Sequence, residues 1–109
     1  MLDIYALEAG DSAPGSNSPD ENKWLGSIGL DEHKRLLLLF KKCESAGIRL
    51  SYFEDSVLSL EEVRIMNEVF DKGFDEIEGD PRAVNAYEKF KKILSAALYK
   101  NAGMASFCD

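Results

Sequence analysis

The sequence contains few of the side chains that most often catalyse reactions or bind metals. Among its 109 residues are one histidine and two cysteines. His33 and Cys43 lie ten positions apart in a predicted helix, which separates them by about 15 Å along the axis and excludes a catalytic pair. We therefore predict that the chain is not an enzyme. His33 is expected to be a solvated surface residue, and both Cys43, packed in the core, and Cys108, exposed, are expected to be free thiols.

Long apolar runs are also missing. The longest, residues 36–40, has five residues, whereas a membrane-spanning helix needs about 20. The first residues do not show the basic segment and following apolar segment of a secretory signal. These absences predict a soluble, cytoplasmic protein without a membrane partner.

Motifs for metal ions and cofactors are absent as well. Residues 71–80 carry several acids, as a calcium loop does. Counted from Asp71, however, the sixth residue is Glu76, where the loop needs glycine, and the twelfth is Arg82, where it needs glutamate. One histidine and two distant cysteines cannot form a closed zinc site within one chain, and no glycine pattern matches a phosphate-binding loop. We predict no metal and no cofactor.

Negative charge is what the sequence has in excess, and it is concentrated in one segment. The chain has 20 acidic and 13 basic residues, a net charge of −7. Residues 54–80 contain ten acids and two bases, a net charge of −8, so the rest of the chain sums to +1. Such a segment attracts a basic partner and disfavours direct contact with nucleic acid or anionic lipid. Solubility alone would be served by interspersed charges, so the lack of lysine in this segment favours a binding role.

The N-terminal part of the chain shows extended and turn-forming segments. Residues 1–8 favour an edge strand, and residues 23–30 suit a short extended segment that could pair with it as a hairpin. Between them, residues 11–22 are rich in turn formers and predict a mobile loop. Residues 48–53 alternate like another short strand.

Three amphipathic helices are predicted in the remaining sequence. The first runs from an Asp31 cap to about Ala46, where Gly47 ends it. The second begins at the capping box formed by Ser59 and Glu62 and stops near Gly73. The third begins at Asp80-Pro81 and runs to Lys100, with Gly103 as its stop. The predicted inward-facing side chains are Leu36, Leu37, Leu39, Phe40 and Cys43 of the first helix, Leu60, Val63, Met66, Val69 and Phe70 of the second, and Val84, Tyr87, Phe90, Leu94, Ala97 and Leu98 of the third.

These elements predict a single domain over residues 1–109, with residues 104–109 as a flexible tail. We expect a mainly α fold in which three principal helices surround one core. A possible small N-terminal β element would make the fold α+β.

The layout of the chain resembles the immunity proteins that accompany bacterial contact-dependent growth-inhibition and polymorphic toxins. The resemblance rests on a short, acidic, mostly helical chain in which residues 47–55, ending in Tyr52-Phe53-Glu54-Asp55, precede Ser59-Leu-Glu-Glu62. It implies an antitoxin-like inhibitor that neutralises a cognate toxin, often a basic nuclease, by covering its active site or an adjacent surface. The acidic segment would then imitate the phosphates that the toxin binds.

Aromatic anchors and carboxylates are the expected contacts with such a partner. Two other functions fit the same sequence. An acidic nucleic-acid mimic would regulate a DNA-binding protein, and a helical adaptor subunit would use the apolar stripe of residues 84–98. The protein itself is expected to be a monomer or a weak homo-oligomer. The predicted partner-binding residues are Tyr52, Glu54, Asp55, Glu62, Asp75, Glu76, Glu78 and Asp80.

Overall fold

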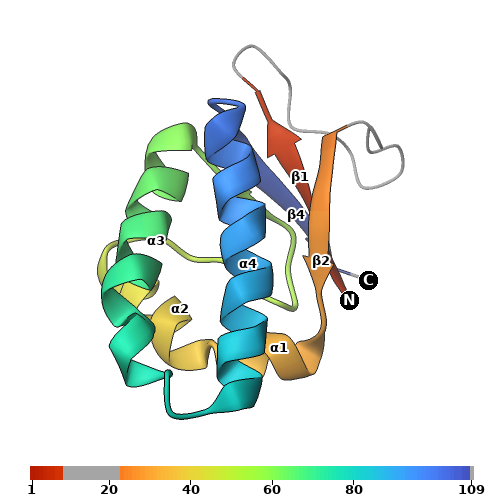
Figure 1. The fold of residues 1–109 in the computed structure, drawn as a ribbon. Helices are drawn as coiled ribbons and strands as arrows, with labels where there is room; N and C mark the ends of the chain where they lie inside the picture. The colour runs from red at the N-terminus through yellow and green to blue at the C-terminus, as the bar shows by residue number, and fades with distance from the viewer. Residues whose placement is uncertain (9–22, 109) are drawn as a thin grey trace.

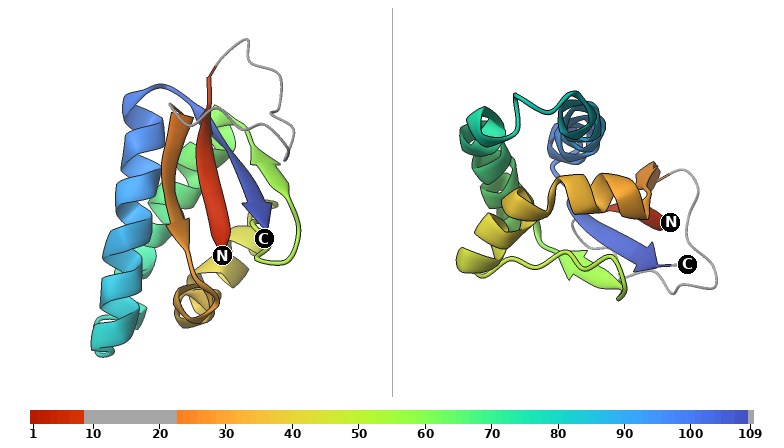
Figure 2. Two further views of the ribbon diagram at one scale, coloured as in Figure 1. Left: turned by 90° about the vertical axis from the view of Figure 1, so that its right-hand side faces the viewer. Right: turned by 90° about the horizontal axis from the view of Figure 1, so that it is seen from below.

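The computed structural model describes residues 1–8 and 23–108 and shows a mixed α+β fold (Figure 1). A four-stranded antiparallel sheet has the strand order β2-β1-β4-β3. Helices α3 and α4 lie against one face of the sheet, and α1 and α2 cross one end between the two layers (Figure 2). The predicted mainly α fold with three principal helices is therefore wrong. The elements are β1 (Leu2–Leu7), β2 (Trp24–Ile28), α1 (Leu30–Arg35), α2 (Leu37–Ser45), β3 (Ser56–Leu58), α3 (Leu60–Gly73), the 3-10 turn η2 (Phe74–Glu76), α4 (Pro81–Tyr99) and β4 (Gly103–Cys108).

The two extended segments predicted near the N-terminus do pair as antiparallel strands. Leu2 lies opposite Ile28, and the register runs from there to Tyr5 opposite Trp24. Strand β1 is not the expected edge strand, however, because its other side pairs with β4. The mobile loop predicted for residues 11–22 lies outside the described residues.

The flexible tail predicted for residues 104–109 is wrong for residues 104–108, because Gly103–Cys108 form β4 in the interior of the sheet. Ala105 lies opposite Tyr5 of β1 on one side and opposite Val57 of β3 on the other. Gly103 is required for this fit, since a Cβ there would overlap the backbone of Leu58. The strand was missed because both of its partners are distant in sequence and its own residues include weak strand formers.

The predicted first helix is two helices. The N-cap is Gly29, not Asp31, and the Gly29 N–H donates to Glu32 Oε1 at 2.8 Å. Leu36 interrupts the helix with φ −101° and ψ 9°. The interruption lets α1 pack on α4 while α2 packs on α3, and it leaves Leu37, predicted to face inward, 41% exposed.

The capping signals of the last two helices are confirmed. Glu62 N–H donates to Ser59 Oγ at 3.1 Å and Ser59 N–H donates to Glu62 Oε1 at 2.9 Å, which completes the capping box of α3. Asp80 caps α4 by accepting from Arg82 N–H at 3.0 Å, with Pro81 as the first helical residue. The predicted stop at Gly103 is wrong. The chain leaves the α4 terminus through Asn101, whose φ is +51°.

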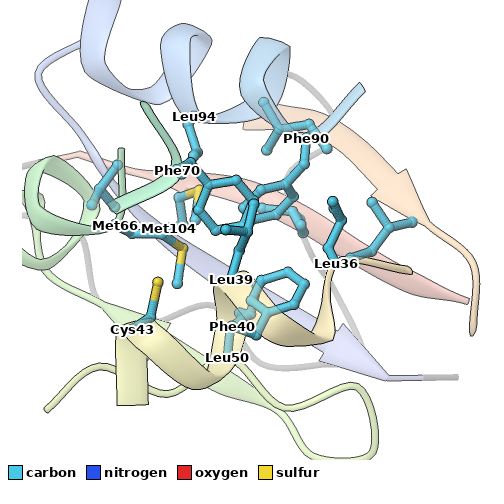
Figure 3. Close-up of a cluster of buried hydrophobic side chains, with 14 of the residues drawn as sticks. Leu36, Leu39, Phe40, Cys43, Leu50, Met66, Phe70, Phe90, Leu94 and Met104 are labelled. Carbon is cyan, nitrogen blue, oxygen red and sulfur yellow. The ribbon is translucent and has the colours of Figure 1, made fainter. Parts of the chain in front are cut away.

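One apolar core lies between the sheet and the helices (Figure 3). At its centre, Phe40 meets Phe70 and Phe90 edge to face at centroid distances of 5.4 and 5.3 Å. Ile48 and Leu50 are also buried, but residues 48–53 do not form the predicted strand. On α4 the buried side is Ala83, Ala86, Phe90, Ile93, Leu94 and Ala97, whereas Val84, Tyr87 and Leu98 are half-buried.

Candidate functional site

The acidic segment does not form one continuous face. Glu62 lies in the first turn of α3, whereas Asp75 and Glu76 follow its last residue, about 20 Å further along the helix axis. Tyr52, Glu54 and Asp55 lie in the loop between α2 and β3. Figure 2 shows this loop and the η2 turn on opposite sides of α1 and α2. The eight predicted partner-binding residues are therefore distributed over three separate places.

Three of these eight residues make hydrogen bonds that hold the fold, and one of them is Asp80, whose side chain caps α4. Glu62 closes the capping box described above. Asp55 Oδ1 accepts the backbone N–H of Cys108 at 3.1 Å. Because β3 pairs with β4 only at residues 104–106, the Asp55 carboxylate takes the place of a strand partner at the end of β4. No sequence pattern indicated this contact between residues 53 positions apart.

Basic side chains from other elements pair with several acids of the segment. The sequence has few lysines within residues 54–80, but the fold brings Lys42 of α2 and Arg35 of α1 beside them. These ion pairs are exposed, and each contributes only about 0–1 kcal/mol to stability. The carboxylates can therefore exchange these partners for basic groups of another protein. The nitrogen-to-oxygen distances are 2.8 Å for Lys42 and Glu76, 3.6 Å for Arg35 and Asp80, and 3.9 Å for Arg49 and Glu54.

Asp75 and Glu78 are the predicted site residues whose charge is least compensated. Both are exposed, and neither side chain makes an ion pair or hydrogen bond with any residue that the structure describes. They lie on the η2 turn and the link that joins α3 to α4, beside Glu76 and Asp80. We refer to Asp75, Glu76, Glu78 and Asp80 as the acidic turn.

His33 is not the solvated residue that the sequence predicted. Its ring is half-buried and stacks on Phe40, with centroids 4.5 Å apart and planes 13° apart. The ring of Tyr52 lies 5.6 Å away on another side. Burial lowers the pKa of His33 below its ordinary value of 6.5, and the contact of Nε2 with the Leu50 carbonyl, at 3.5 Å, opposes this shift in part. His33 is therefore mostly neutral near pH 7. Through its contacts with Phe40, Tyr52 and the Leu50 carbonyl, it also connects the α2–β3 loop to the core.

The two thiols differ in setting. Cys43 is fully buried, and burial together with the nearby Glu44 raises its pKa to about 11, so it does not supply a thiolate near neutral pH. Cys108 is half-buried at the end of β4, where Sγ lies 3.4 Å from the Phe53 carbonyl. Neither cysteine forms a disulfide with another described residue.

Within the described part of the chain, residues 1–8 and 23–108, no three His, Cys, Asp or Glu side chains come together in a way that could hold a metal ion. None of the helices described there is long and apolar enough to cross a membrane.

No family model matches the chain, and no curated protein or solved structure is significantly similar to it. The resemblance to immunity proteins therefore stays a prediction from the sequence. The function is therefore inferred from the charges and exposed side chains on the surface of the described residues.

Proposed function

We propose that this protein is a cytoplasmic inhibitor that binds and neutralises a basic protein, in the manner of the immunity proteins of bacterial toxin systems. The observation that carries the proposal is the acidic turn, which presents four carboxylates within six residues at one end of the molecule. Two of these, Asp75 and Glu78, have no compensating partner among the described residues.

Electrostatics would govern how such an inhibitor finds its partner. A net charge of −7 attracts a basic protein from a distance, and locally uncompensated carboxylates orient the encounter. If the partner is a nuclease, its phosphate-binding lysine and arginine side chains are the charges that Asp75 and Glu78 would attract during the encounter. The described side chains suit binding rather than catalysis, because His33 packs against Phe40 and Cys43 is buried.

The two alternative functions predict different behaviour. An acidic nucleic-acid mimic would use the same carboxylates but should bind several phosphate-recognising proteins rather than one. A helical adaptor would need an exposed apolar stripe on α4. Phe90, Leu94 and Ala97 of that stripe are buried in the core and its other members are half-buried, which disfavours the adaptor.

Growth of a host that expresses the adjacent reading frame tests the proposal. Toxicity should appear without this protein and disappear with it, and the two proteins should co-purify at low salt and less well at high salt. A harmless neighbour, or toxicity that this protein does not relieve, would contradict the immunity function.

Charge reversal then tests the acidic turn. Asp75→Lys with Glu78→Lys should slow association and weaken its salt dependence. The melting temperature should change little, because neither side chain makes a hydrogen bond or ion pair with a described residue. The control is Glu68→Lys with Glu88→Lys, since these exposed acids on α3 and α4 also lack partners among the described residues. Both pairs of changes move the net charge from −7 to −3, so equal effects would show that only total charge matters.

A further inference from the structure

The loop between α2 and β3 displays an aromatic ring to solvent. Phe53 is 74% exposed, although phenylalanine is usually a core residue. Directly before β3, Asp55 is hydrogen-bonded to the end of β4, and Val57 within β3 is 54% exposed. Both exposed apolar side chains belong to the segment at the free edge of the sheet.

The loop that carries Phe53 is fastened on several sides. The Phe53 N–H donates to Ser51 Oγ at 3.2 Å, and the Phe53 carbonyl lies 3.4 Å from Cys108 Sγ. The ring of Tyr52 packs edge to face on Phe53 at 5.4 Å and also contacts His33. The backbone of Phe53 therefore contacts β4 through Cys108, and its ring contacts Tyr52, which packs on His33.

A displayed aromatic ring on a preorganised loop has the properties of an interface hot spot. Aromatic anchors that insert into pockets account for most of the binding free energy of many interfaces. A loop that is already ordered loses little conformational entropy when it binds. The carboxylate of Glu54, adjacent to the ring, is 66% exposed and has only a 3.9 Å contact with Arg49.

We infer that Phe53 is the anchor of the partner interface and inserts into an apolar pocket whose rim carries a lysine or arginine that pairs with Glu54. The basic charge of the partner follows from the proposed function. The role of Phe53 as anchor is inferred separately, from the exposure of its ring and the contacts that hold its loop. This assignment separates two roles. The acidic turn, on another side of the molecule, accelerates association, and Phe53 determines how long the complex lasts.

The chain offers a matched control for the anchor. Tyr99, at the end of α4, is 91% exposed and is likewise a large aromatic residue. Phe53→Ala and Tyr99→Ala each remove an exposed ring, and the melting temperature of both variants should stay close to that of the wild type. Phe53→Leu keeps an apolar side chain and provides an intermediate case.

The experiment uses the wild type and the three variants as parallel baits in low-salt extract of the source cells, followed by binding kinetics with the protein that the wild type captures. Phe53→Ala should lose the captured protein, with dissociation faster by about 30-fold or more. Tyr99→Ala should retain the captured protein, and Phe53→Leu should fall between. Equal retention by Phe53→Ala, or no capture by any bait, overturns the inference.

The growth test distinguishes this inference from the proposed function. A captured protein that depends on Phe53 but is harmless to the host supports the anchor and refutes toxin neutralisation. A toxic protein that Phe53→Ala binds as tightly as the wild type refutes the anchor and leaves the proposed function intact.

Discussion

Asp55→Ala tests whether the carboxylate at this position holds the end of β4, as the structure indicates, rather than a partner. The substitution removes the carboxylate that accepts the Cys108 N–H at 3.1 Å. A hydrogen bond to a charged group contributes about 1.5–3 kcal/mol. Because Asp55 is exposed, water can replace part of this, and we expect a loss of about 1 kcal/mol. The entropy of unfolding is about 2.1 cal/mol/K per residue, so the melting temperature should fall by about 4 °C.

Thermal unfolding followed by circular dichroism measures this change, and hydrogen exchange locates it. The Cys108 amide should exchange faster in Asp55→Ala, while the amides at the centre of β4 should change less. Asp55→Asn keeps an acceptor oxygen and should lose less than half as much stability. An unchanged melting temperature together with unchanged exchange at Cys108 would refute the structural role and return Asp55 to the list of possible partner contacts.

Two further substitutions test other parts of the fold. Gly103→Ala places a Cβ against the backbone of Leu58 and should lower the free energy of unfolding by about 1–3 kcal/mol. Denaturant unfolding identical to that of the wild type would contradict the close approach of β3 and β4 at this position. His33 has a folded-state pKa below its unfolded value of 6.5, so its contribution to stability is present above about pH 6.5 and is lost as pH falls through the folded pKa. His33→Gln should therefore show a shallower loss of stability between about pH 7 and 5, and identical slopes for the two proteins would exclude His33 as a source of this pH dependence.

The parts of the fold that the sequence predicts are those determined by neighbouring residues. The capping box of Ser59 and Glu62 and the Asp80-Pro81 start of α4 involve groups within three positions of each other, and both are present in the structure. Strand β4 depends instead on β1, about 100 positions away, and on β3, about 50 positions away. Pairing between segments so far apart leaves no local sequence pattern, so the sequence of this interior strand predicted a flexible tail.

The candidate site was harder to predict for the same reason. Charge summed along the chain shows where the acids are concentrated in the sequence, but it does not show what lies beside them in space. Lys42 and Arg35 precede the segment in the sequence, yet they pair with Glu76 and Asp80. The exposed phenylalanine was noted next to Glu54 and Asp55, but only the structure shows that it is displayed while Tyr52 is half-buried.

Cys108 joins the two parts of this site, because both Phe53 and Asp55 are fastened to it. Loss of the Asp55 carboxylate should therefore loosen the loop and weaken partner binding indirectly, with lower stability and faster exchange at Cys108. Loss of the Phe53 ring removes its contact with Tyr52 but keeps the loop hydrogen bonds, which use the backbone N–H and carbonyl of Phe53, so binding should weaken with little change in stability or exchange. The two substitutions thus separate a residue that supports the interface from one that forms it, and binding measured beside amide exchange is sufficient to tell them apart.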